Sequence, residues 1–113
     1  MRNMHFYRDA AGDPRVEASP SLARLGYYLE SDVQGNASHA RAILDTIERV
    51  ADGKTRAWQE TGNAHTLTLA PEGAVIEAEF EEDAPACRLS LDDLRAAVAG
   101  WLSFLERTHR EER

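Results

Sequence analysis

The chain has 113 residues, of which 42% are hydrophobic and 29% are charged, so we expect a single domain over residues 1–113 with one hydrophobic core. No apolar run approaches the roughly 18 residues of a membrane helix, and the start MRNMHFYRDA lacks the apolar core of a signal peptide, which favours a cytoplasmic protein without a membrane partner. The net charge of −7 argues against nucleic acid as a direct partner, and the single cysteine, Cys87, excludes an internal disulfide.

The first part of the chain predicts a β-hairpin followed by a short helix. Met4 to Arg8 has the composition of a strand, and a turn that contains Gly12 lets Arg15 to Ala18 pair back onto it. From Ser21 onward, apolar residues recur at intervals of three or four, which is typical of one helical face, although Gly26 weakens this prediction. These apolar residues are Leu22, Leu25, Leu29 and Val33.

A clearer helix is predicted in the middle of the chain. Asn36 or Ser38 caps its start, and it runs to about Asp52, where Gly53 suits the left-handed turn that ends a helix. Its apolar stripe consists of Ala40, Ile43, Leu44, Ile47, Val50 and Ala51. This helix should therefore lie on a sheet.

The C-terminal helix carries the most regular apolar stripe in the sequence, and Ser90 is its predicted cap. The stripe consists of Leu91, Leu94, Val98, Trp101 and Leu105, spaced three or four residues apart. Gly100 is unfavourable inside a helix, and we expect it to let another element approach Trp101 closely. Residues 107–113 are polar and are expected to form a frayed tail.

The stretch from Trp58 to Phe80 predicts a three-stranded antiparallel meander. Apolar and polar residues alternate over two runs, Leu67/Leu69 and Ile76/Ala78/Phe80, whose apolar side should face the core. Gly62-Asn63 and Pro71-Glu72-Gly73 provide the turns, and Cys87 to Leu89 is a candidate fourth strand. The predicted fold class is α+β: an antiparallel sheet made of the N-terminal hairpin and the meander, with helices packed on one face and an amphipathic C-terminal helix.

Acidic residues gather in one segment. The stretch from Glu72 to Asp93 holds eight of them and one base, Arg88, so it carries the whole net charge. Glu77 and Glu79 point to the same side of the predicted strand, away from the core. The segment is either a solvated sheet edge that prevents aggregation or a surface that attracts a basic protein partner. Its acidic residues are Glu72, Glu77, Glu79, Glu81, Glu82, Asp83, Asp92 and Asp93.

Little in the sequence indicates catalysis. The four histidines, His5, His39, His65 and His109, lack metal-ligand spacing and are expected at the surface or its boundary. The glycines are scattered and form no phosphate-binding loop, so neither a metal nor a cofactor is predicted. Cys87, on a predicted strand, is interpreted as a small buried apolar side chain. The one enzymatic alternative is a small hydrolase in which His65 pairs with Glu60 or Glu79 as acid and base.

Several blocks of the sequence resemble known bacterial families. They are FYRD-x-x-G (Phe6 to Gly12), LGYYLESDVQ (Leu25 to Gln34), AWQETGNAHTLTL (Ala57 to Leu69), GAVIEAEF (Gly73 to Phe80) and LDDL…W-x-x-FL (Leu91 to Leu105). Together they are similar to the small YacL-like proteins and to the CdiI immunity proteins of contact-dependent growth inhibition. The immunity resemblance implies a cytoplasmic protein that binds and neutralises one cognate toxin, commonly a basic nuclease.

The resemblance and the charge together favour an immunity protein and not an enzyme. The predicted partner-binding residues are Glu77, Glu79, Glu81, Glu82 and Asp83, with Tyr27 and Tyr28 as aromatic anchors. The alternatives are a YacL-like housekeeping protein whose partner is unknown and the hydrolase that uses His65. The sequence leaves the identity of the toxin and the oligomeric state open.

Overall fold

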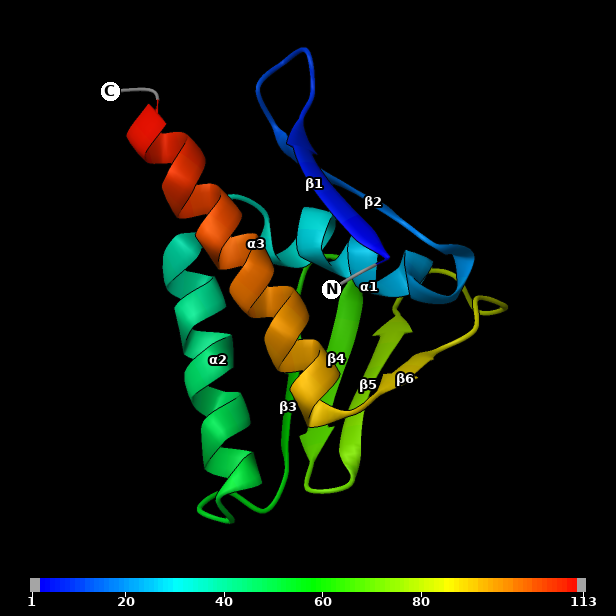
Figure 1. The fold of residues 1–113 in the computed structure, drawn as a ribbon. Helices are drawn as coiled ribbons and strands as arrows, with labels where there is room; N and C mark the ends of the chain where they lie inside the picture. The colour runs from blue at the N-terminus through cyan, green and yellow to red at the C-terminus, as the bar shows by residue number, and fades with distance from the viewer. Residues whose placement is uncertain (1–2, 112–113) are drawn as a thin grey trace.

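The computed structural model describes the backbone of residues 3–111 and the side chains of residues 3–107. The elements follow in the order β1 (Met4–Arg8), β2 (Pro14–Ala18), a 3-10 helix η1 (Pro20–Leu22), α1 (Ala23–Tyr28), a π-helix η2 (Leu29–Val33), α2 (Ala37–Ala51), β3 (Trp58–Thr61), β4 (His65–Ala70), β5 (Gly73–Ala78), β6 (Cys87–Leu89) and α3 (Leu91–Glu111) (Figure 1). The predicted α+β class is confirmed. The predicted frayed tail falls mainly on residues whose side chains, from 108 onward, lie outside the described part.

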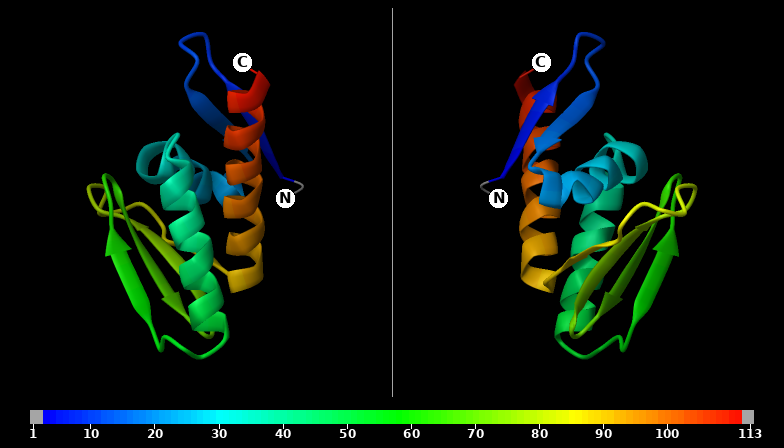
Figure 2. Two further views of the ribbon diagram at one scale, coloured as in Figure 1. Left: turned by 90° about the vertical axis from the view of Figure 1, so that its left-hand side faces the viewer. Right: turned by 90° about the vertical axis from the view of Figure 1, so that its right-hand side faces the viewer.

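The strands form two separate antiparallel sheets. The meander and its fourth strand pair in the order β3-β4-β5-β6, as the alternating sequence predicts, with Leu67 opposite Ile76. The N-terminal hairpin does not join this sheet, because β1 and β2 form a sheet of their own. Figures 1 and 2 show this hairpin beside the C-terminal half of α3.

Both long helices lie on the same side of the four-stranded sheet. Figure 2 shows the sheet nearly edge-on, with α2 next to it, α3 beyond α2, and the opposite face of the sheet uncovered. Because side chains alternate along a strand, Leu67, Leu69 and Ile76 point to the helices, where they are buried. The uncovered face carries Gln59, Thr61, Thr66, Thr68, Val75, Glu77 and Arg88.

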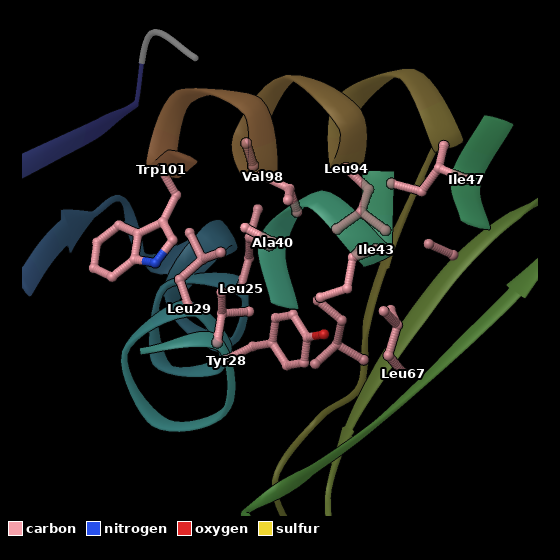
Figure 3. Close-up of a cluster of buried hydrophobic side chains, with 14 of the residues drawn as sticks. Leu25, Tyr28, Leu29, Ala40, Ile43, Ile47, Leu67, Leu94, Val98 and Trp101 are labelled. Carbon is pink, nitrogen blue, oxygen red and sulfur yellow. The ribbon is translucent and has the colours of Figure 1, made fainter. Parts of the chain in front are cut away.

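One hydrophobic core lies between the sheet and the helices. Figure 3 shows side chains from α1, η2, α2, α3 and β4 meeting in it, among them Leu25, Leu29, Ile43, Leu67, Leu94 and Trp101. Cys87 is buried there, as expected. The Trp101 ring packs edge-on against Phe6 of the hairpin, with ring centroids 5.4 Å apart. Gly100 permits the predicted close approach, since a β-carbon on it would lie 3.1 Å from Phe6 Cε2.

The predicted helix ends are confirmed at three positions. Asn36 caps α2, because its Oδ1 accepts a hydrogen bond from the His39 backbone N–H at 3.0 Å. Gly53 follows that helix with a φ of 79°, the left-handed conformation expected of it. Ser90 Oγ accepts from the Asp93 backbone N–H at 3.0 Å at the start of α3.

The helix predicted from Ser21 is divided into three pieces: a 3-10 helix, α1 and the π-helix η2. Its apolar face is confirmed, because Leu25, Leu29 and Val33 are fully buried. The π-helix ends at Val33, and the carbonyl oxygen of the next residue, Gln34, accepts a hydrogen bond from Trp101 Nε1 at 2.7 Å. Single π-helical turns are frequent at functional sites, and this one carries the acidic residue on which the candidate site depends.

Candidate functional site

Polar residues on α1 and η2 converge on one histidine of the sheet. Arg24, Tyr28 and Asp32 are spaced four residues apart, so they lie along one side of the helical segment. All three meet His65 at the start of β4. Arg24 and Asp32 do so by hydrogen bonds, and the Tyr28 ring packs edge-on with its centroid 6.0 Å from that of the imidazole.

Asp32 is a buried carboxylate that binds His65 twice. Its Oδ1 accepts from the ring Nδ1 at 2.9 Å, and its Oδ2 accepts from the His65 backbone N–H at 3.1 Å. Oδ2 also accepts from the Ala64 N–H at 3.3 Å. Gly62 makes room for this carboxylate, because a β-carbon on residue 62 would overlap Oδ2. Asp32 therefore ties η2 to the turn between β3 and β4.

The other ring nitrogen of His65 faces Arg24. Nε2 lies 3.3 Å from Arg24 Nη1, and because a guanidinium only donates hydrogen bonds, Nε2 is the acceptor and the ring proton is on Nδ1. Arg24 Nη2 lies 3.3 Å from Glu81 Oε2, and Arg24 Cζ lies 5.7 Å from the centre of the Tyr27 ring. The contacts form a chain from Asp32 in the interior, through His65 and Arg24, to Glu81 at the surface.

A pocket of about 530 Å³ opens beside this chain. Arg24, His65 and Glu81 line its polar side, and Tyr27, Ala78 and Phe80 line its apolar side. Among the described residues, Tyr27 and Phe80 are the large hydrophobic side chains that are exposed, at 55% and 82%. The prediction that Phe80 faces the core is wrong, because β5 ends at Ala78 and the alternation stops before Phe80.

Tyr28 is buried, with 2% of its surface exposed, so its predicted role as a surface anchor is wrong. Its ring points from α1 toward the sheet, near Leu67 (Figure 3). Within the described part of the chain its hydroxyl has no hydrogen-bond partner. Burial raises the pKa of Tyr28 above its usual range, and the carboxylates of Glu60 and Asp32 raise it further. Tyr28 therefore belongs to the core.

The predicted acidic residues lie in two places. Glu81 lines the pocket, and Glu82 and Asp83 are exposed in the same loop. Glu77 and Glu79 instead lie on the uncovered face of the sheet, where the Glu79 carboxylate accepts a hydrogen bond from a threonine hydroxyl. Glu81 therefore shares a pocket with the exposed aromatic residues, whereas Glu77 and Glu79 do not.

The pairings predicted for His65 are wrong. Glu60 Oε1 pairs with His39 Nε2 at 2.8 Å, and His65 pairs with Asp32, a partner that the sequence pattern does not predict. His65 is also buried and not at the surface. The spacing of the polar row on α1 and η2 is the signal that could have indicated this site, but the spacing alone does not name the strand residue that the row meets.

The remaining histidines and the described helices add no further site. His5 is exposed and His39 is half-buried, as expected, and the side chain of His109 lies outside the described residues. Within the described residues, no group of three or more histidine, cysteine, aspartate or glutamate side chains could hold a metal ion. Of the helices described, none has the length and apolar character needed to cross a membrane.

Comparisons with known proteins point to one bacterial family. The model of UPF0231, an uncharacterised protein family, matches residues 3–84. A UPF0231 protein of Cronobacter sakazakii is 36% identical over 108 residues, which cover 89% of this chain and 86% of the relative. A UPF0231 protein of Klebsiella pneumoniae is 34% identical over 84 residues, which cover 69% of this chain and 67% of the relative. No solved structure matches the chain.

These matches correct the resemblance described above. The family model and the relatives belong to a family distinct from the CdiI immunity proteins, so the assignment to an immunity family is wrong. They are compatible with the alternative, a housekeeping protein whose partner is unknown. The chain belongs to the uncharacterised protein family UPF0231.

Proposed function

We propose that this protein is a binding protein that takes up a basic segment of a protein partner at the pocket beside α1 and β5. The observation that carries the proposal is the position of Tyr27 and Phe80. Among the described residues, they are the large hydrophobic side chains that are exposed, and both line the same pocket. Exposed aromatic rings at a concave site are typical of partner-binding surfaces, because covering their area on binding stabilises a complex.

The charge of the loop after β5 supports a basic partner. Glu81 lines the pocket, and Glu82 and Asp83 follow it as exposed residues. Among the described residues, Arg24 is the one arginine or lysine that lines the pocket. Such a field speeds the association of a basic segment and repels phosphate, which disfavours nucleic acid. The face of the Phe80 ring also attracts a lysine or arginine side chain by cation–π interaction.

The contacts of His65 support binding over hydrolysis. A general base must reach the proton that it removes from a substrate. The Nε2 atom of His65 already accepts a hydrogen bond from Arg24, and the ring is buried. We therefore interpret the pair of Asp32 and His65 as the support that fixes the polar wall of the pocket.

The proposal is tested by titrating isotope-labelled protein with three synthetic peptides of matched length and hydrophobic content, one basic, one neutral and one acidic, all with free carboxyl ends. We expect the basic peptide to bind most tightly, to shift the backbone amide signals of Tyr27, Phe80 and Glu81, and to lose affinity as salt is added. Equal binding of the three peptides, or shifts confined to another surface, would contradict the proposal.

Variants locate the interface. Phe80→Ser removes the exposed ring and should weaken binding of the basic peptide by about 1–3 kcal/mol, the cost of losing an aromatic anchor. Reversing the charge of Glu82 and Asp83 to lysine should slow association and reduce its salt dependence. The matched control is Glu77→Lys, on the uncovered face of the sheet. It should change neither the affinity for the basic peptide nor the rate and salt dependence of association.

A further inference from the structure

Arg24 is a half-buried arginine whose hydrogen-bonding capacity is little used. Its side chain is 14% exposed, and its Nε is buried without a hydrogen-bond partner among the described residues. Its contacts with His65 and Glu81 are both 3.3 Å long, whereas strong charge-assisted hydrogen bonds are roughly 2.8 Å. Arg24 lines the pocket, and its Nη1 and Nη2 groups, which make only these two long contacts, suit a group that brings acceptor oxygens.

The carboxylate that now lies on Arg24 comes from the neighbouring loop. Glu81 supplies it from a side chain that is 66% exposed, so this ion pair is weak and the carboxylate can return to water at little cost. The contact between Glu81 and Arg24 indicates which chemical group the guanidinium binds: a single carboxylate on the pocket side.

We propose that Arg24 binds the C-terminal carboxylate of the partner's basic segment, which takes the place of Glu81. This inference rests on the proposed function and names the part of the partner that enters the pocket. The last side chain of the segment then packs against Tyr27 and Phe80, while the basic residues before it lie near Glu82 and Asp83. A volume of about 530 Å³ is that of a small-ligand site and accommodates a chain end.

A carboxylate at a chain end fits this site better than other anions. A phosphate carries more charge than Arg24 alone neutralises, and the carboxylates of Glu82 and Asp83 would repel it. A carboxylate on a side chain would require an acidic segment, which the same loop repels. A basic segment supplies its one carboxylate at its C-terminus.

The test compares two versions of the basic peptide, one ending in a free carboxylate and one ending in an amide, by isothermal titration calorimetry. We expect wild-type protein to bind the free acid at least roughly tenfold more tightly, because the amide forfeits a charge-assisted hydrogen bond. Arg24→Gln should bind the two peptides alike. Arg88→Gln, which alters an exposed arginine on the uncovered face, should keep the wild-type preference.

A second variant makes the test independent of how well Arg24→Gln folds. Glu81→Gln removes the competing carboxylate, so the preference for the free acid should rise by roughly twofold to fivefold. An unchanged or smaller preference would contradict the displacement of Glu81. If wild-type protein binds both peptides equally at the pocket, the proposed function stands and this inference is overturned. If neither peptide binds, both are overturned.

Discussion

Gly62 and Asp32 are in such close contact that a β-carbon on residue 62 would overlap the Oδ2 atom of the carboxylate. Asp32 reaches the backbone N–H groups of Ala64 and His65 because the turn presents no side chain at this point. We expect Gly62→Ala to lower the free energy of unfolding by about 1–3 kcal/mol, the usual cost of overpacking. Urea denaturation monitored by circular dichroism measures this change.

The matched control for that substitution is Gly35→Ala. A β-carbon on Gly35 would lie 3.9 Å from Pro14 Cγ, an ordinary contact, so the free energy of unfolding should change by less than about 0.5 kcal/mol. If Gly62→Ala were as stable as Gly35→Ala, the Asp32 carboxylate would be free to leave the turn without cost.

Replacing Asp32 itself should be more damaging. Asp32→Ala leaves three donors at a buried site without an acceptor: the ring Nδ1–H of His65 and the backbone N–H groups of His65 and Ala64. We expect the free energy of unfolding to fall by about 2–4 kcal/mol in chemical denaturation near neutral pH. Asp45→Ala, which removes an exposed carboxylate paired with Arg49 on α2, should cost less than about 1 kcal/mol. Equal losses in the two variants would show that the pair of Asp32 and His65 contributes no more than a surface contact.

Most of the fold could be predicted because it depends on patterns that are local in the sequence. The alternation around Leu67 and Ile76 predicts the meander, and the stripe through Leu94 and Trp101 predicts α3, since each pattern needs only residues of one element. The separation of the hairpin from the main sheet could not be predicted in this way. It depends on the packing of Phe6 against α3, which no local pattern encodes.

The candidate site could be predicted only in part. The sequence predicts Tyr27 and Glu81 as partner-binding residues. His65 and Asp32, in contrast, are 33 residues apart and meet only because η2 packs against the turn before β4. The exposure of Phe80 depends on the residue at which β5 ends, and strand ends are less well determined by the sequence than the strands themselves.

Substitutions at Gly100 and Phe6 separate two effects on stability: the helix propensity of residue 100 and its packing against the Phe6 ring. Alanine is favoured over glycine inside a helix by about 1 kcal/mol. A β-carbon on Gly100, however, would lie 3.1 Å from Phe6 Cε2, so the ring must move to admit it. We expect Gly100→Ala to leave the free energy of unfolding of the wild type almost unchanged. In a Phe6→Leu background the same substitution should raise it by about 1 kcal/mol, as measured by chemical denaturation. The same gain in both backgrounds would show that Phe6 does not oppose the methyl group.

Tyr28 should make the stability of the protein depend on alkaline pH. Burial, together with Glu60 and Asp32, raises its pKa in the folded state, whereas the unfolded phenol ionises with a pKa of about 10. Above that pH the unfolded chain has released a proton that the folded chain retains, so the unfolded state is increasingly favoured. Tyr28 makes its full stabilising contribution below about pH 10. As the pH rises above about 10, the free energy of unfolding should fall by up to roughly 1.4 kcal/mol per pH unit.

The Tyr28→Phe variant separates this contribution from general alkaline effects. Near neutral pH the substitution should change the free energy of unfolding by less than about 1 kcal/mol, because within the described residues the hydroxyl has no hydrogen-bond partner to lose. Between about pH 10 and 11 the variant should lose less stability than the wild type. A Tyr28→Phe profile as steep as that of the wild type would mean that another group causes the alkaline loss, since the deleted phenol is the only group that the substitution removes from titration.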